Sequence, residues 1–166
     1  MKKIDNFDIF NEKDNNENEI IKKIQSVLSE DLLKSDWKKK ISDKDHITKG
    51  HCYAATEALY YLLGGKDSGY IPQHGRTEEG THWWLKNKNG KILDPTAEQF
   101  YHIGMNPPYN KGIGGGFLTN YPSKRSQEII NRVNNINESI KDYLKPKTDE
   151  EIQKSLNGLS KEDAYL

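Results

Sequence analysis

Cysteine is almost missing from this chain, which has a single one, Cys52, among 166 residues. One thiol cannot form an intramolecular disulfide, so the fold must be stabilised by packing. Long apolar runs are missing too: nothing approaches the roughly 18 consecutive apolar residues of a membrane-spanning helix. The amino-terminal stretch 1–5 also lacks the apolar segment of a secretory signal. These features predict a cytoplasmic protein without a membrane partner.

Net charge is the next thing that the sequence lacks, because 25 Lys and Arg residues balance 25 Asp and Glu residues. A chain without net charge has no overall field to attract nucleic acid or an anionic membrane, and we expect neither as a partner. Hydrophobic residues make up only 33% of the chain. Such a composition predicts a small core surrounded by polar elements.

Signals for cofactors are also weak. No Cys-x-x-Cys or His-x-x-x-His spacing supports a metal site. The glycine run 114–116 lacks the Lys-Ser/Thr ending of a phosphate-binding loop and the context of a dinucleotide fingerprint. We therefore expect no metal and no cofactor, and interpret the glycines as a flexible loop that could cover a cleft.

The length fits one domain with polar ends. Residues 1–17 predict a flexible arm, 18–145 a single domain, and 146–166 a short helix and tail. Helical spacing of apolar residues predicts helices over about 18–29 and 124–143, the second packed against a sheet. Trp37 is interpreted as a core anchor.

The stretch Gly50-His51-Cys52-Tyr53-Ala54-Ala55 is the centre of the functional argument. Helical spacing from Cys52 and the stop signal Gly64-Gly65 predict a helix over about 52–63. A thiol on the first turn faces unpaired backbone N–H groups and the positive end of the helix dipole, and both favour thiolate over thiol. The pattern predicts a nucleophile, with the Cys52 N–H as an oxyanion donor.

A base and a group that orients it come next in the chain. Segments 81–86 and 91–96 predict two antiparallel strands, with His82 opening the first and Asp94 closing the second. A three- or five-residue loop around Lys88 would bring both side chains to one face, whereas a two-residue turn at Asn89-Gly90 would separate them. The functional interpretation requires the longer loop.

Five other residues are proposed to contact substrate. Before the hairpin, 70–74 predicts an edge strand and 75–80 a polar loop at one lip of the cleft. Alternation on the strand directs one of two neighbouring tryptophans into the core and leaves the other as a possible stacking wall. The sequence does not decide which of the side chains of His51, Gln73 and Gln99 would be a second oxyanion donor. The predicted substrate-binding residues are His51, Gln73, Trp83, Trp84 and Gly115.

The Gly-x-Cys-aromatic-Ala run, the His-aromatic strand and the closing Asp-Pro-Thr together resemble the core of transglutaminase-like proteins, a branch of the papain-like cysteine hydrolases and acyltransferases. The resemblance spans 50–96. It implies Cys52 as nucleophile, His82 as general base and acid, and Asp94 as the group that orients the imidazole. The implied fold is α+β: a central helix carrying the cysteine packs on a small antiparallel sheet, with flanking amino- and carboxy-terminal helices.

Stretches 114–119 and 122–125 extend the resemblance to a group of small phage-encoded proteins, which implies no activity but places the chain in a host cytoplasm. Two functions are then expected. The first is cysteine-dependent acyl transfer or amide hydrolysis, as a thiol protease, amidase or transglutaminase-like enzyme, on a peptide, protein or small-molecule amide. The second is a non-catalytic binding protein that uses the same pocket to capture a host protein or small molecule. Nothing in the sequence specifies an oligomeric state.

Overall fold

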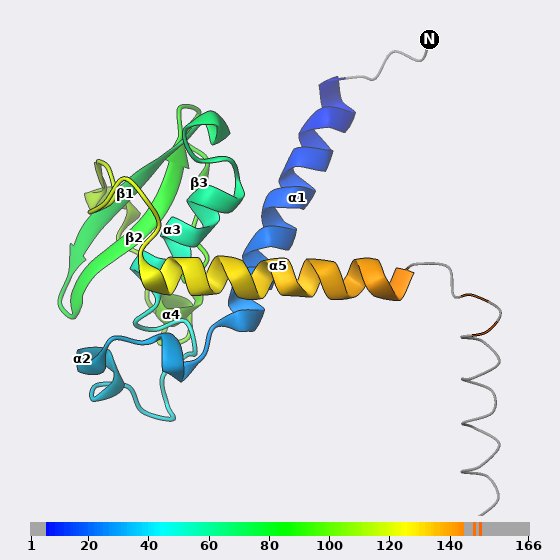
Figure 1. Cartoon of the computed structure of the whole chain (residues 1–166). Helices are drawn as coiled ribbons and strands as arrows, with labels where there is room; N and C mark the ends of the chain where they lie inside the picture. Colours follow the sequence, from blue (N-terminus) through cyan, green and yellow to red (C-terminus); the bar gives the residue numbers. More distant parts are fainter. Residues whose placement is uncertain (1–5, 145–147, 149, 151–166) are drawn as a thin grey trace, which may run out of the picture. The chain divides into compact units, whose positions relative to one another are not determined.

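The computed structural model describes residues 6–144, 148 and 150, and within them it has a mixed α+β fold (Figure 1). The helices are α1 (Asn6–Val27), α2 (Ser35–Lys38), α3 (Cys52–Leu62), α4 (Glu98–Tyr101) and α5 (Lys124–Leu144), with short 3-10 helices η1 (Glu30–Leu32), η2 (Gly65–Ser68) and η3 (Tyr109–Lys111). The strands are β1 (Tyr70–Thr77), β2 (Gly80–Asn87), β3 (Ile92–Leu93) and β4 (Ile113–Gly114). Two compact units, 1–134 and 135–166, divide the chain inside α5 rather than near residue 145.

The first helix begins at Asn6, so the expected flexible arm over 1–17 is wrong for residues 6–17. Glu17 fixes this helix to the rest of the fold, and it is only 1% exposed. The Glu17 carboxylate accepts a hydrogen bond of 2.8 Å from the Tyr70 hydroxyl and pairs with Lys91. These partners lie far along the chain, which is why the polar sequence alone suggested a loose segment. Residues 1–5 lie outside the described part.

The sheet is antiparallel throughout, in the order β3-β2-β1-β4. The predicted polar loop 75–80 is instead mostly strand, since β1 and β2 form a hairpin that turns at Glu78 and Glu79. β1 is also not the predicted edge strand, because β4 pairs with it at Gln73 and His74. Pro72 is tolerated in β1 because its nitrogen, which has no hydrogen to donate, points toward the short β4 and not toward β2. On that side the Pro72 carbonyl accepts a hydrogen bond from Gly115 N–H.

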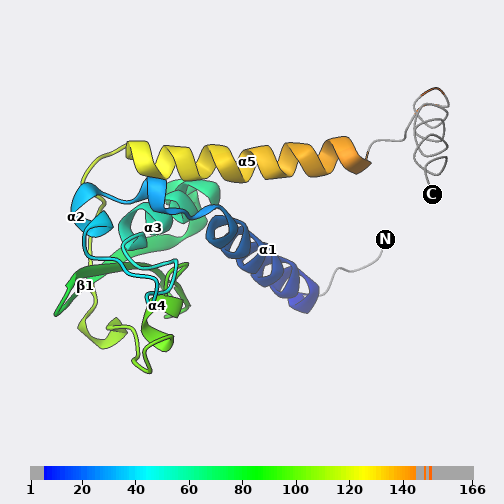
Figure 2. The same cartoon turned by 90° about the horizontal axis from the view of Figure 1, so that it is seen from below.

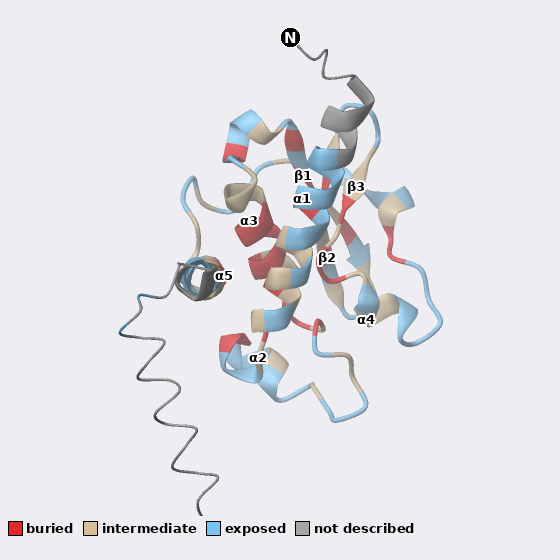
Figure 3. Ribbon diagram, turned by 90° about the vertical axis from the view of Figure 1, so that its right-hand side faces the viewer, coloured by how far each residue is buried: buried red, intermediate tan, exposed pale blue. Residues whose placement is uncertain are grey.

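Helix α3 packs against β2 and forms the centre of the core (Figure 3). Ala55, Ala58 and Leu59 are completely buried, together with Leu85 of β2, which pairs with Leu93 of β3. Burial of a leucine side chain stabilises the fold by about 2 kcal/mol. This confirms the expected arrangement of a cysteine-bearing helix on a small antiparallel sheet.

The last helix has nearly the predicted bounds, Lys124–Leu144. Its start is fixed by the buried Glu57 of α3, which accepts hydrogen bonds of 2.6 Å from Ser123 N–H and from the Ser126 hydroxyl. The Ser126 hydroxyl also lies 3.1 Å from the Ala54 carbonyl. The beginning of α5 therefore packs on α3 and not on the sheet, as Figure 2 also shows. The predicted tail 146–166 lies outside the described residues except for 148 and 150.

None of the helices in the described residues combines the length and the apolar character needed to cross a membrane.

Candidate active site

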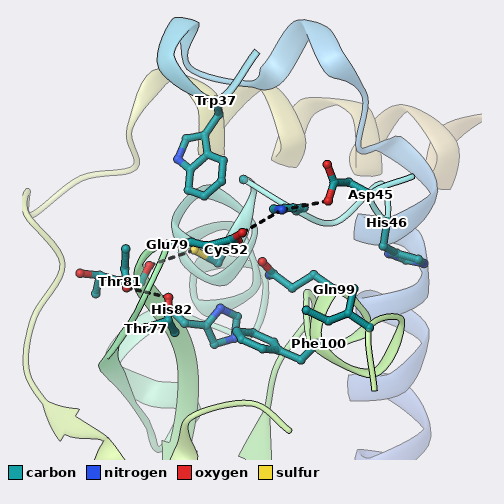
Figure 4. Close-up of a pocket in the computed structure, with 14 residues that line it drawn as sticks. Trp37, Asp45, His46, Cys52, Thr77, Glu79, Thr81, His82, Gln99 and Phe100 are labelled. Atoms are coloured by element: carbon teal, nitrogen blue, oxygen red, sulfur yellow. Dashed lines mark hydrogen bonds and ion pairs between the residues drawn. The ribbon is translucent and has the colours of Figure 1, made fainter. Parts of the chain in front are cut away.

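Cys52 is the first residue of α3, as its sequence context predicts, and its side chain is half-buried. The thiol donates a hydrogen bond to the Thr81 carbonyl oxygen at 3.4 Å (Figure 4). On ionisation this bond is lost, because the sulfur and the oxygen are then both acceptors. The sulfur is then free to interact with a cation across the cleft.

Gly50 sets the approach of the chain to Cys52. Its φ of 83° lies in the left-handed region that side chains disfavour. A Cβ atom at this position would lie 2.8 Å from Leu33 Cδ2 and 3.2 Å from the Trp37 ring. The glycine is thus required both for backbone conformation and for space.

Replacing Gly50 with alanine is expected to lower the free energy of unfolding by about 2 to 4 kcal/mol, because backbone strain adds to overpacking. Urea unfolding measures the loss. Gly90→Ala is the matched control, since Gly90 has a φ of 86° with nothing within 4 Å of the added carbon. It should lose only the strain, about 1 kcal/mol. Equal losses in the two variants would show that the contacts with Leu33 and Trp37 do not constrain the chain.

His82 and Asp94 form the closest charged pair of the site, with 2.7 Å between His82 Nε2 and Asp94 Oδ2 and both side chains 2% exposed. The hairpin explains how they meet. Leu85 pairs with Leu93, and Asn87 N–H bonds the Lys91 carbonyl, so a three-residue loop is centred on Asn89 rather than Lys88. This register makes the two side chains diagonal neighbours on one face, so the required same-face arrangement is confirmed while the predicted loop centre is off by one residue.

The Asp94 carboxylate is fully occupied by hydrogen bonds. Oδ1 accepts from the backbone N–H and the hydroxyl of Thr96, at 2.9 and 3.2 Å. Oδ2 accepts from His82 and from the Tyr109 hydroxyl at 3.0 Å. Burial and the negative charge of Asp94 raise the pKa of Tyr109, so its hydroxyl stays a neutral donor. Sequence reasoning missed Tyr109, which no local pattern connects to the hairpin.

The ionisation of His82 is the main electrostatic feature. Burial lowers its pKa, but hydrogen bonds and negative charge from Asp94 and Cys52 outweigh burial and raise it to about 9. Because Nε2 is engaged with Asp94, Nδ1 is the ring nitrogen left to serve Cys52. Phe100 covers the ring edge-on, with centroids 4.6 Å apart, and Trp84 lies at 5.9 Å. The imidazole is therefore charged at neutral pH and fixed in orientation.

The cleft at Cys52 has a wall that was not expected. Trp37, interpreted from sequence as a core anchor, is half-buried and lines the cleft beside Cys52 (Figure 4). Lys49 closes one rim by bridging Asp45 at 2.8 Å and Glu79 at 3.2 Å. Gln99 also lines this cleft, but its amide nitrogen is used by the Thr96 carbonyl at 2.9 Å. Gln99 in this orientation offers an acceptor, not an oxyanion donor.

The predicted substrate-binding residues divide into two groups. Trp83 is half-buried and lines a cavity shared with Cys52, which fits the predicted wall. Trp84 is 1% exposed and packs over Gly75 and Gly112, so it is a buried residue. Neither His51, Gln73 nor Gly115 lines the cavities that contain Cys52.

These three misplacements have separate causes. The His51 side chain is fully buried at the N-cap of α3, and burial lowers its pKa to about 4, so it stays neutral. Gln73 lies in the middle of the sheet and faces Gly114. Gly115 is held at the sheet edge by its bond of 3.0 Å to the Pro72 carbonyl, and is not a cover over Cys52.

Within the described residues, no group of three or more His, Cys, Asp or Glu side chains is arranged to hold a metal ion. Comparison with known proteins finds no matching family model, curated protein or solved structure. The site must therefore be interpreted from its own geometry.

Proposed function

We propose that this protein is a cysteine-dependent hydrolase or acyltransferase that acts through Cys52, His82 and Asp94. One observation carries the proposal. The Cys52 thiol, on the first turn of α3, shares a cleft with the His82 imidazole, and Nε2 of that ring lies 2.7 Å from the buried Asp94 carboxylate. This is the arrangement that nucleophilic catalysis needs, with a nucleophile, a base and a group that orients the base.

The chemistry follows from the roles. The Cys52 thiolate attacks the carbonyl carbon of an amide, ester or thioester and forms a carbon–sulfur bond. The His82 imidazolium gives its Nδ1 proton to the leaving group as that bond breaks. Neutral His82 then takes a proton from water or an amine, which attacks the acyl carbon. The carbon–sulfur bond breaks, and thiolate and imidazolium are restored.

One donor is available for the oxyanion of this reaction. The Cys52 N–H has no intrahelical partner because it belongs to the first helical residue. Donors directed at a developing oxyanion supply a large share of acyl-transfer catalysis.

The resemblance to transglutaminase-like proteins supports the same assignment, because nucleophile, base and orienting carboxylate occur in the family's order along the chain. The α+β fold, with the cysteine-bearing helix against an antiparallel sheet, is compatible with a papain-like core. We therefore also propose that the fold contains a papain-like core and that the substrates are amides of peptides, proteins or small molecules.

A panel of aryl thioesters and peptide anilides tests the function. We expect a mass increase equal to the acyl group on Cys52 under rapid quenching, with release of the thiol or aniline. Cys52→Ala should give neither. Adding methylamine distinguishes transfer from hydrolysis by the product formed. A protein that binds panel members but never forms the adduct or releases a leaving group would contradict catalysis and favour the binding-protein alternative.

A further inference from the structure

Arg125, on the first turn of α5, is a half-buried cation without a carboxylate partner in the described part of the chain. Its Nε donates to the Leu32 carbonyl and its Nη2 to the Gly50 carbonyl, at 3.1 Å. Its Nη1 has no hydrogen-bond partner among these residues. Arg132, two turns further along α5, is instead paired with Asp31 and Glu128. A partly buried guanidinium normally requires a counter-charge.

The cavity beside Arg125 supplies a reason for this exception. Arg125 and Cys52 line the same cavity, together with the basic side chains Lys34 and Lys40. Two acidic residues, Asp36 and Glu79, also line it, and Glu79 is engaged by Lys49. Burial lowers the pKa of Arg125, and the negative charge of the Cys52 sulfur opposes that effect. The guanidinium and the Cys52 sulfur therefore belong to one cavity and influence each other through their charges.

Three large apolar or aromatic side chains also line this cavity. Tyr53, Trp83 and Leu118 line this cavity, and the Tyr53 and Trp83 rings meet edge-on with centroids 5.1 Å apart. The Tyr53 hydroxyl is used elsewhere, accepting from Leu118 N–H at 3.0 Å. An acyl chain with an apolar body and an anionic end would find the nucleophile, an apolar surface and a cation in one cavity.

We propose that Arg125 binds a carboxylate of the acyl donor, so that the enzyme prefers acyl groups carrying a free carboxylate a short distance from the reacting carbonyl. This rests on the proposed acyl-transfer function. Arginine suits the role because its planar fork presents several donors to a carboxylate at once, and Nη1 is available for it.

A pair of alkylating reagents tests the subsite without a known substrate. Iodoacetate and iodoacetamide transfer the same carbon to the Cys52 thiolate with loss of iodide, but only iodoacetate has a carboxylate. We expect the rate with iodoacetate divided by the rate with iodoacetamide to be about tenfold higher for Cys52 than for free glutathione. A factor of about ten corresponds to the free energy of one charge-assisted hydrogen bond. Arg125→Gln should remove this preference, Arg125→Lys should keep part of it, and the paired Arg132→Gln should leave it unchanged.

The same comparison separates the possible failures. If Arg125→Gln slows both reagents equally, Arg125 only holds the Gly50 carbonyl and the subsite is refuted. If wild-type protein shows the glutathione ratio, no carboxylate site exists. Either result leaves acyl transfer itself standing, which is tested by the thioester panel. A second readout is the ratio of kcat/KM for a glutaryl thioester to kcat/KM for the matching thioester with a neutral terminal amide. We expect this ratio to be roughly ten in wild type and to fall to about one in Arg125→Gln.

Discussion

Replacing His82 with alanine is expected to slow alkylation of Cys52 by iodoacetamide at about pH 6 by tenfold or more, since loss of one favourable charge interaction of about 1.4 kcal/mol has that effect. The pKa of His82 is raised to about 9 by Asp94 and Cys52 in spite of its burial, so the ring is charged at this pH. Without the imidazolium, the thiolate loses the charge interaction that His82 supplies. Because the chain has one cysteine, the reaction reports on this sulfur alone.

The pH dependence gives this experiment its control. Near pH 10 His82 has lost its proton, so wild type and His82→Ala should react at nearly equal rates. His102→Ala is the matched variant, because His102 is exposed, bonds the Lys44 carbonyl and does not line the cleft. It should behave as wild type throughout. A His82→Ala protein that reacts like wild type at pH 6 would refute the ion pair, and with it the catalytic interpretation.

Asp94→Ala is expected to cause the largest loss of stability, about 3 to 5 kcal/mol in urea unfolding, because it leaves a buried cation without its partner. The Tyr109 hydroxyl and two groups of Thr96 also lose their acceptor. Asp94→Asn keeps the shape of the side chain and should lose less. Both variants should also alkylate slowly at pH 6, since His82 is then neither oriented nor held in its charged form.

The stability difference between wild type and Asp94→Asn should depend on pH in a defined direction. The pKa of His82 rises from an ordinary value of 6.5 to about 9 on folding, so its stabilising contribution is complete below 6.5 and is lost as pH rises through about 9. The full contribution corresponds to about 3 kcal/mol and is shared between Asp94 and Cys52. The difference should therefore shrink between pH 6.5 and 9. A difference that stays constant over this range would mean that Asp94 acts only through shape and neutral hydrogen bonds.

The sequence by itself determined the features that depend on neighbours along the chain. Helical spacing and a glycine stop predicted the helix that begins at Cys52, and the same reasoning predicted α5 to within a residue. The meeting of His82 and Asp94 followed from strand alternation once the loop length was fixed, because both residues belong to one hairpin. Such features are set by local periodicity and turn chemistry.

Only the tertiary structure decided the surroundings of these residues. Tyr109 reaches Asp94, Trp37 lines the cleft, and Arg125 faces the cavity from a helix more than seventy residues after Cys52. The burial of Glu17, which extends α1, likewise depends on a tyrosine from β1. No short-range pattern encodes these contacts, because they arise when separate elements pack around α3 and their polar groups must find partners away from water.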